Sequence, residues 1–197
     1  MNAFESLSGR IDAIVMGASA GGVEALCTLL PAVPAQLSVP VLIVLHLPRD
    51  RPSLLADIFA TRCQRPVREP LDKDPIEPGV VYVAPPDYHM LVDVGPQIAL
   101  SADELVNFSR PSIDVLFESA ADFYGERLLG IILTGANEDG AEGLAAIRGA
   151  GGITVVQKPE DAHSPYMLVS ALNRTPVDFV CSLAEIADLL RALDRGE

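Results

Sequence analysis

One short stretch of the chain constrains its fold more than any other. An apolar run from Ile11 to Met16 breaks into Gly17-Ala18-Ser19-Ala20-Gly21-Gly22 and resumes at Val23. The two runs predict a buried strand and an amphipathic helix, joined by a sharp turn whose glycines tolerate unusual torsions. Residues 17–21 match G-x-S-x-G, a pattern that presents a serine hydroxyl beside the backbone N–H groups of a helix start. Ser19 is therefore a candidate nucleophile.

The same kind of turn also occurs where proteins bind phosphate or simply reverse direction. The dinucleotide fingerprint G-x-G-x-x-G fits poorly, because Ser19 occupies the position of its second glycine and no acidic residue comes directly after the next apolar run. That position is held by His46. A nucleotide-binding domain is therefore a weaker interpretation than a serine hydrolase.

Two further polar residues come after predicted strands. His46 lies directly after the apolar residues 41–45, and Asp139 lies in the loop after the apolar residues 128–133. Because the carboxyl ends of parallel strands meet at one edge of a sheet, we expect Ser19, His46 and Asp139 to lie close together. Asp139 would then accept a hydrogen bond from His46 and fix its tautomer.

Each of these residues also has an ordinary structural interpretation. A lone histidine at a strand end is often packed or solvated, and Asp139 is well placed to cap a helix beginning at Gly140. The combination still favours catalysis, since nucleophile, base and carboxylate each come after a different predicted strand. The chain order Ser, His, Asp differs from that of the α/β-hydrolases, in which the histidine comes last.

The alternation of apolar strands and helices predicts an α/β fold, a doubly wound, mostly parallel sheet with helices on both faces. Residues 89–94 and 97–100 predict an antiparallel hairpin at its edge, and a helix is expected over residues 109–124. Ser182-Leu183-Ala184-Glu185 is a capping box that begins the last helix. We expect a single domain over residues 1–197.

Composition narrows the class of protein. The formal net charge of −13 argues against a nucleic-acid partner. No apolar run approaches the length of a membrane-spanning helix and the first ten residues do not resemble a signal peptide, so we expect a cytoplasmic protein without membrane insertion. The cysteines lack metal-ligand spacing, so we expect idle thiols and neither a metal nor a cofactor.

A basic segment begins just after His46. Between Arg49 and Arg68 five arginines (49, 51, 62, 65 and 68) accompany two aspartates, a local balance of +3 in an acidic chain. One interpretation is a solvated face with ordinary surface ion pairs. The other is a docking site for an acidic substrate protein, formed by Arg49, Arg51 and Arg62.

The chain resembles the catalytic domain of the chemotaxis protein-glutamate methylesterases, the CheB family. The residues that carry this resemblance are 17–22, 44–48, 79–85, 87–91, 110–117, 130–135 and 139–141. The resemblance implies that Ser19 is the nucleophile, His46 the general base and Asp139 its orienting acid, with the backbone at Ala20 and Ala136 beside the oxyanion. It also implies hydrolysis of methylated glutamate side chains on a chemoreceptor, with deamidation of receptor glutamines as a related reaction.

The chain departs from the family pattern in several places. Ala20 replaces a usual threonine, Ala136-Asn137-Glu138 replaces Met-Gly-Asn, and Tyr166-Met167-Leu168 replaces Gly-Met-Pro. Family members usually carry an N-terminal receiver domain, and we expect none here, so that any regulation would come from a separate protein. The alternative function is a weak or inactive homologue that acts as a binding module in a signalling complex.

Overall fold

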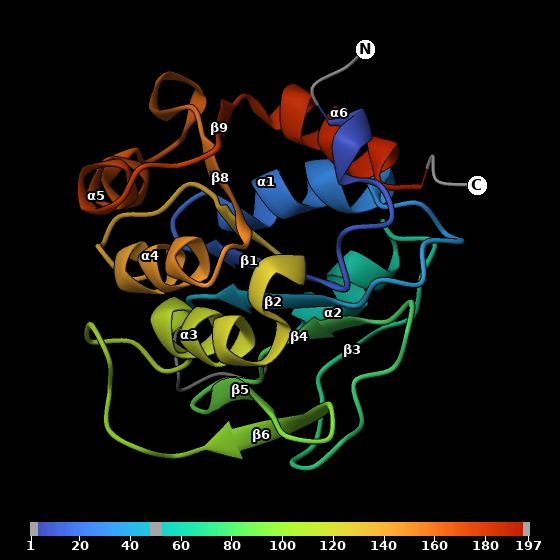
Figure 1. Cartoon of the computed structure of the whole chain (residues 1–197). Helices are drawn as coiled ribbons and strands as arrows, with labels where there is room; N and C mark the ends of the chain where they lie inside the picture. Colours follow the sequence, from blue (N-terminus) through green and yellow to red (C-terminus); the bar gives the residue numbers. More distant parts are fainter. Residues whose placement is uncertain (1–3, 48–52, 195–197) are drawn as a thin grey trace.

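A seven-stranded sheet crosses the molecule, and every neighbouring pair of its strands is parallel (Figure 1). The computed structural model describes residues 4–47 and 53–194. In spatial order the strands are β3 (Val67–Arg68), β4 (Val81–Val83), β2 (Val41–Leu45), β1 (Ala13–Ala18), β7 (Leu128–Ile132), β8 (Ile153–Gln157) and β9 (Phe179–Cys181).

Helices cover both faces of this sheet and enclose two hydrophobic cores. One core contains apolar residues of α1 (Gly22–Leu29), α2 (Leu55–Ala60) and α6 (Leu183–Ala192). The other contains those of α3 (Ile113–Tyr124), α4 (Ala141–Gly149) and α5 (Tyr166–Arg174). Short 3₁₀ turns lie between these elements: η1 (Glu5–Leu7), η2 (Leu30–Ala32), η3 (Gly125–Arg127) and η4 (Pro159–Asp161). The predicted doubly wound α/β fold is confirmed.

Helix starts reflect the local chemistry of the sequence. The capping box at the start of α6 is confirmed, since the Ser182 hydroxyl accepts from the Glu185 N–H and the Glu185 carboxylate accepts from the Ser182 N–H. Helix α3 begins later than predicted, because Ser112 is its N-cap and accepts from the Val115 N–H. No helix in the described ranges is long and apolar enough to cross a membrane.

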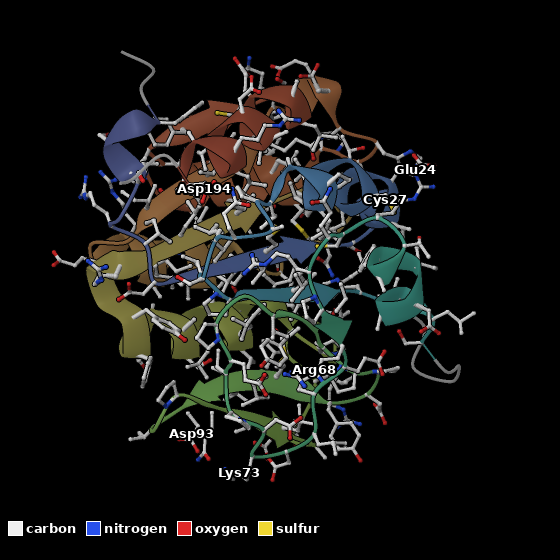
Figure 2. The ribbon with its side chains drawn as sticks, turned by 90° about the vertical axis from the view of Figure 1, so that its right-hand side faces the viewer. Glu24, Cys27, Arg68, Lys73, Asp93 and Asp194 are labelled. Carbon is white, nitrogen blue, oxygen red and sulfur yellow. The ribbon has the colours of Figure 1, made fainter. Side chains whose placement is uncertain are left out.

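The predicted hairpin exists but forms a two-stranded sheet of its own, β5 (His89–Asp93) and β6 (Gln97–Ser101), instead of extending the edge of the main sheet. It packs against α3, where the Val92 N–H donates to Ser119 Oγ at 3.1 Å, and it lies below that helix in Figure 1. The segment leading to it is tied to β5 by an ion pair between Lys73 and Asp93, which lie together at the foot of Figure 2.

The strand order brings three loops to one place. The chain passes from β1 to β2 on one side of β1, and β7 later pairs on the other side. In the registers, Gly17 of β1 faces both Val44 of β2 and Ile132 of β7. The three strands therefore end at the same level, at the point of an open α/β sheet where ligands usually bind.

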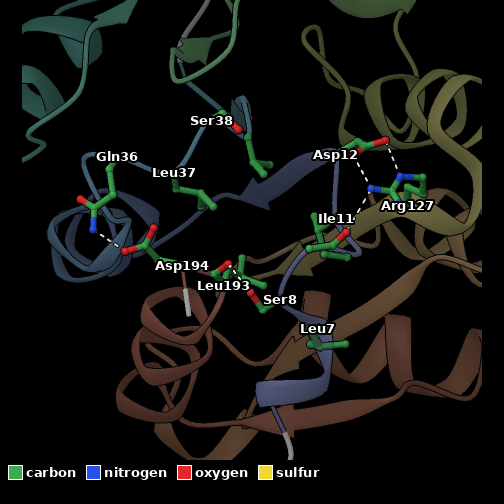
Figure 3. A pocket seen from close by; sticks show the side chains of 12 residues that line it. Leu7, Ser8, Ile11, Asp12, Gln36, Leu37, Ser38, Arg127, Leu193 and Asp194 are labelled. Atoms are coloured by element: carbon green, nitrogen blue, oxygen red, sulfur yellow. Dashed lines mark hydrogen bonds and ion pairs between the residues drawn. The ribbon is translucent and has the colours of Figure 1, made fainter. Parts of the chain in front are cut away.

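A hollow of about 650 Å³ lies at the amino ends of the strands, opposite the carboxyl ends just described (Figure 3). Residues preceding β1, β2 and β7 line it together with the end of α6. Figure 3 shows its polar contacts: Arg127 pairs with Asp12 at 2.7 Å, and Gln36 donates to Asp194. Because this hollow lies at the amino ends of the strands, it is remote from the predicted catalytic residues.

Candidate active site

Ser19 and His46 are neighbours because of the sheet register. Ala18 pairs with Leu45, so the next residue of each strand, Ser19 and His46, leaves the sheet beside the other. The His46 N–H donates to the Ala18 carbonyl at 3.1 Å, and the Ser19 N–H donates to the carbonyl of Thr134 at 2.9 Å. These backbone hydrogen bonds therefore fix the positions of the Ser19 and His46 backbones, from which the two side chains extend.

Two glycines make the turn after Ser19 possible. Gly21 has φ +81°, and a Cβ there would lie 2.5 Å from the His163 Cβ. A Cβ at Gly22 would lie 2.5 Å from Leu45 Cδ1. The left-handed torsion at Gly21 and the close approaches at both positions favour glycine, as the sequence predicts.

The buried carboxylate of Asp139 binds the imidazole of His46. His46 Nε2 lies 2.7 Å from Asp139 Oδ2, with the histidine side chain 12% exposed and the aspartate fully buried. The sequence placed both residues at the carboxyl edge of the sheet, and the structure brings them into direct contact. This leaves His46 Nδ1 as the second ring nitrogen, available for a proton.

The interpretation that Asp139 caps the helix after it is wrong. The N-cap of α4 is Gly140, and Asp139 instead binds the start of the neighbouring helix α3. Its Oδ2 accepts from the Ile113 N–H at 2.6 Å, and its Oδ1 accepts from the Asp114 N–H at 3.1 Å. The side chains of Ser112 and Asn107 donate to the same carboxylate at 2.8 and 3.1 Å.

These donors decide the charge of Asp139. Burial alone would raise the pKa of this carboxyl. The hydrogen bond from His46 and the attraction to its protonated form, together with the Ile113 N–H and the Ser112 hydroxyl, outweigh it. The pKa of Asp139 therefore lies below its usual range. A carboxylate held ionised at a helix N-terminus stabilises an imidazolium when His46 takes up a proton.

Asp114 makes the reciprocal arrangement at the start of α4. Its Oδ1 accepts from the N–H groups of Gly140 and Gly143 at 2.9 and 2.7 Å, and its Oδ2 accepts from Asn107 Nδ2 at 2.8 Å. Burial, with a contribution from the charge of Asp139, raises the pKa of Asp114 to about 6. The start of α4 thus binds an aspartate of α3, and the start of α3 binds the aspartate that comes just before α4, which fixes the loop containing Asp139 against α3.

Asn137 defines the tautomer of His46. Its Oδ1 accepts from the Asp139 N–H at 3.2 Å, so its Nδ2 faces His46 Nδ1 at 3.3 Å. Because an amide nitrogen only donates, Nδ1 carries the lone pair and Nε2 carries the hydrogen that points to Asp139. In this tautomer the lone pair of Nδ1 can accept a proton once the hydrogen bond from Asn137 is broken.

The other predicted site residues differ in position. Ala20 comes after Ser19 in the turn, and its carbonyl accepts from Thr134 Oγ1 at 2.8 Å. Ala136 is exposed in the loop after β7, so both alanines lie at the carboxyl edge. Glu138 is also exposed and lines a hollow together with residues of α4 and α5.

The described arginines of the basic segment differ in their surroundings. Arg62 is exposed at the end of α2, whereas Arg49 and Arg51 lie outside the described residues. Arg65 is buried and donates to three backbone carbonyls, those of Gly79, Leu37 and Val39, at 2.6–2.8 Å. Arg68 pairs with Glu77 at 2.8 Å, above the hairpin in Figure 2. The pair of Arg68 and Glu77 is a surface ion pair of the ordinary kind, whereas the sequence did not distinguish the buried Arg65 from the surface arginines.

Ser19 and His46 come directly after neighbouring paired strand ends, and the imidazole of His46 binds the buried carboxylate of Asp139. Serine hydrolases bring together the same three residue types. The chain order of these residues on the doubly wound sheet, Ser19, His46 and Asp139, differs from that of the α/β-hydrolases.

Comparison with known proteins agrees with this class. The family model of the CheB methylesterases matches residues 14–190. The crystal structure of the Thermotoga maritima CheB methylesterase catalytic domain superimposes with a TM-score of 0.88 at 27% identity, covering 93% of this chain and 98% of that one. The chain therefore belongs to the CheB methylesterase family, a family of hydrolases.

Relatives differ in length. A Leptospira interrogans relative is 46% identical over 185 residues, which cover 94% of this chain and 96% of the relative. A Symbiobacterium thermophilum protein named protein-glutamate methylesterase/protein-glutamine glutaminase is 43% identical over 189 residues. These cover 93% of this chain but 51% of that protein, so the chain spans about half of its length.

Proposed function

We propose that this chain hydrolyses methyl esters of glutamate side chains on chemoreceptors, releasing methanol, and that it deamidates receptor glutamines by the same route. The observation that carries the proposal is the chain of neighbours from Ser19 through His46 to Asp139, built by the β1–β2 register and the 2.7 Å contact. The family and the names of the relatives supply the substrate class. The cytoplasm is the compartment in which we propose that it acts.

In the proposed reaction Ser19, His46 and Asp139 each have one role. Ser19 Oγ attacks the ester carbonyl carbon while its proton passes to His46 Nδ1, and the carbonyl oxygen becomes an oxyanion. Asp139 stabilises the imidazolium that forms. The C–OCH₃ bond then breaks, and the imidazolium protonates the departing methoxide to methanol.

The second half of the reaction restores the enzyme. Water attacks the acyl-Ser19 ester and gives its proton to His46, and the collapse of the intermediate returns that proton to Ser19 Oγ and releases glutamate. With a glutamine substrate, ammonia leaves in place of methanol. The backbone N–H groups of Ala20 and Ala136 are the proposed oxyanion donors, because both residues lie at the carboxyl edge.

The proposed docking arginines are Arg49, Arg51 and Arg62. Of these Arg62 is described, and its exposure leaves it free to attract an acidic receptor segment. Replacing Arg62 with serine is expected to weaken receptor turnover at low salt and to reduce its salt dependence. Arg10, exposed ahead of β1 at the opposite edge, is the matched control, and an equal effect of Arg10→Ser would remove Arg62 from the docking site.

The function is tested with receptors that carry radiolabelled methyl groups. The wild-type protein is expected to release labelled methanol, whereas Ser19→Ala and His46→Ala lose roughly 10⁶-fold in rate. Ser164→Ala is the matched control, because Ser164 lies at the same edge and contacts Thr134 through its backbone. Release that survives Ser19→Ala, or a wild-type protein that leaves the label in place, would refute the proposal.

A further inference from the structure

Residues Val106–Ser109 form a tight two-residue turn beside the candidate active site. The N–H groups of Val106 and Ser109 donate to each other's carbonyls at 3.1 and 2.9 Å. The two central residues, Asn107 and Phe108, have φ of 49° and 61°. Asparagine adopts this left-handed conformation readily, but phenylalanine does so only at a cost in free energy.

This turn is fixed to the catalytic residues. Asn107 Nδ2 donates both to Asp139 Oδ1 at 3.1 Å and to Asp114 Oδ2 at 2.8 Å. On the other side of the turn, Ser109 Oγ accepts from Asn137 Nδ2 at 3.4 Å. The carboxylate that holds His46 therefore also holds the backbone that presents Phe108.

Phe108 points into solvent. Its exposure is 95%, the highest among the large hydrophobic side chains of residues 4–47 and 53–194. It borders an open hollow of about 630 Å³ whose lining includes Leu105 and Arg110. Neither packing nor backbone preference accounts for phenylalanine at this position, because the side chain is exposed and its backbone conformation is costly.

Further exposed aromatic residues lie at the same edge of the sheet. Tyr88, 46% exposed, lies in the loop after β4, and its neighbour Asp87 pairs with Arg110 at 2.7 Å, two residues from Phe108. Tyr166, 57% exposed, begins α5, where the Met167 N–H donates to the Gly135 carbonyl of the catalytic loop. Exposed aromatic side chains thus border the active site on two sides.

We propose that Phe108 is the docking contact for the protein segment that carries the esterified glutamate, and that it packs against an apolar side chain of that segment. This inference rests on the proposed function. A glutamate ester arrives attached to its protein, so the neighbouring surface of that protein must lie over the carboxyl edge, where the turn projects. Buried aromatic residues at the centre of such contacts usually supply most of the binding energy.

The decisive variant is Phe108→Asn, because asparagine favours the left-handed conformation and preserves the turn. Methanol release is measured in parallel on a methylated receptor and on a small soluble methyl ester. The expected result is a loss in kcat/KM on the receptor at least about 10-fold larger than the loss on the small ester, carried mainly by KM. Phe108→Tyr keeps the aromatic ring, so its kcat/KM on the receptor is expected to stay close to that of the wild type.

Phe123→Ala provides the matched control. Phe123 is also an exposed aromatic, but it lies near the end of α3, at the amino edge of the sheet, so its loss is expected to leave the ratio of the two activities unaltered. Equal losses on both substrates for Phe108→Asn, or none on either, would overturn the docking role alone. A wild-type protein that hydrolyses the small ester but not the receptor would refute the proposed function, and the docking partner with it.

Discussion

Replacing Asp139 with asparagine separates a catalytic carboxylate from an ordinary helix cap. Asparagine caps helices about as well as aspartate, so a simple cap would tolerate the change. In this structure one carboxylate accepts five hydrogen bonds, from His46, Ser112, Ile113, Asp114 and Asn107. An amide offers one acceptor oxygen and one NH₂ group.

Either orientation of the amide leaves a buried donor without an acceptor. With the NH₂ group in the place of Oδ2, the Ile113 N–H loses its partner and His46 is forced into the wrong tautomer. With the NH₂ group in the place of Oδ1, the Asp114 N–H loses its acceptor, and Asn107 keeps only its bond to Asp114 Oδ2. A buried unsatisfied donor costs about 1–3 kcal/mol, so we expect a loss of about 2–4 kcal/mol in the free energy of unfolding.

Turnover is expected to fall by roughly 10⁴ because the imidazolium loses its counter-charge and its orientation. Stability is measured by urea denaturation monitored by circular dichroism, and turnover with a small methyl ester. Glu138→Gln is the matched control, since this neighbouring carboxylate is exposed and its change is expected to stay within about 0.5 kcal/mol. If Asp139→Asn kept stability within that margin and turnover within about 10-fold, the reasoning would fail.

Asn137→Gly removes the amide that contacts His46 Nδ1 at 3.3 Å, the nitrogen proposed to take the proton of Ser19, so turnover of a small ester is expected to rise about 2- to 10-fold, as for the loss of one hydrogen bond; a fall would mean that Asn137 aids catalysis. Asp114 has a pKa of about 6, above the ordinary 3.8, so its carboxyl favours the folded state at low pH and loses that contribution, about 3 kcal/mol at most, as pH rises from about 4 to 6. In urea titrations the free energy of unfolding of the wild type, measured relative to Asp114→Asn, should therefore fall between pH 4 and 7. A difference that does not change with pH would contradict the raised pKa. Arg65→Met leaves three carbonyls without a donor and is expected to lower the free energy of unfolding by about 2–4 kcal/mol, without changing the salt dependence of receptor turnover; a marginal change in urea stability would refute its structural role.

The sequence predicted the parts of this molecule that depend on local patterns. Apolar runs ending at the same edge of a parallel sheet were sufficient to bring together Ser19, His46 and Asp139, and the Ser182–Glu185 spacing was sufficient for the capping box. These features need only periodicity, strand direction and short-range chemistry.

The remainder depends on contacts between distant segments. Asn107 and Asp114 lie 32 and 25 positions before Asp139. No spacing rule indicates that the side chain of Asn107 and the backbone N–H of Asp114 donate to the Asp139 carboxylate. Arg65 resembles its neighbouring arginines in sequence, and only the fold shows that it binds carbonyls inside the protein. The hairpin was predicted correctly as a local element, but its partner, α3, was not, because packing partners are chosen by tertiary structure.

The central claim is that Ser19 forms a covalent acyl intermediate with His46 as its base. A fluorophosphonate, which reacts with activated serines, is added in increasing amounts, and the labelled residue is mapped by mass spectrometry while methanol release from a methylated receptor is measured in the same samples. The account predicts that the label maps to Ser19, that activity falls in proportion to the labelled fraction, and that His46→Ala abolishes labelling. A label on another serine, or methanol release that persists when Ser19 is fully labelled, would contradict it.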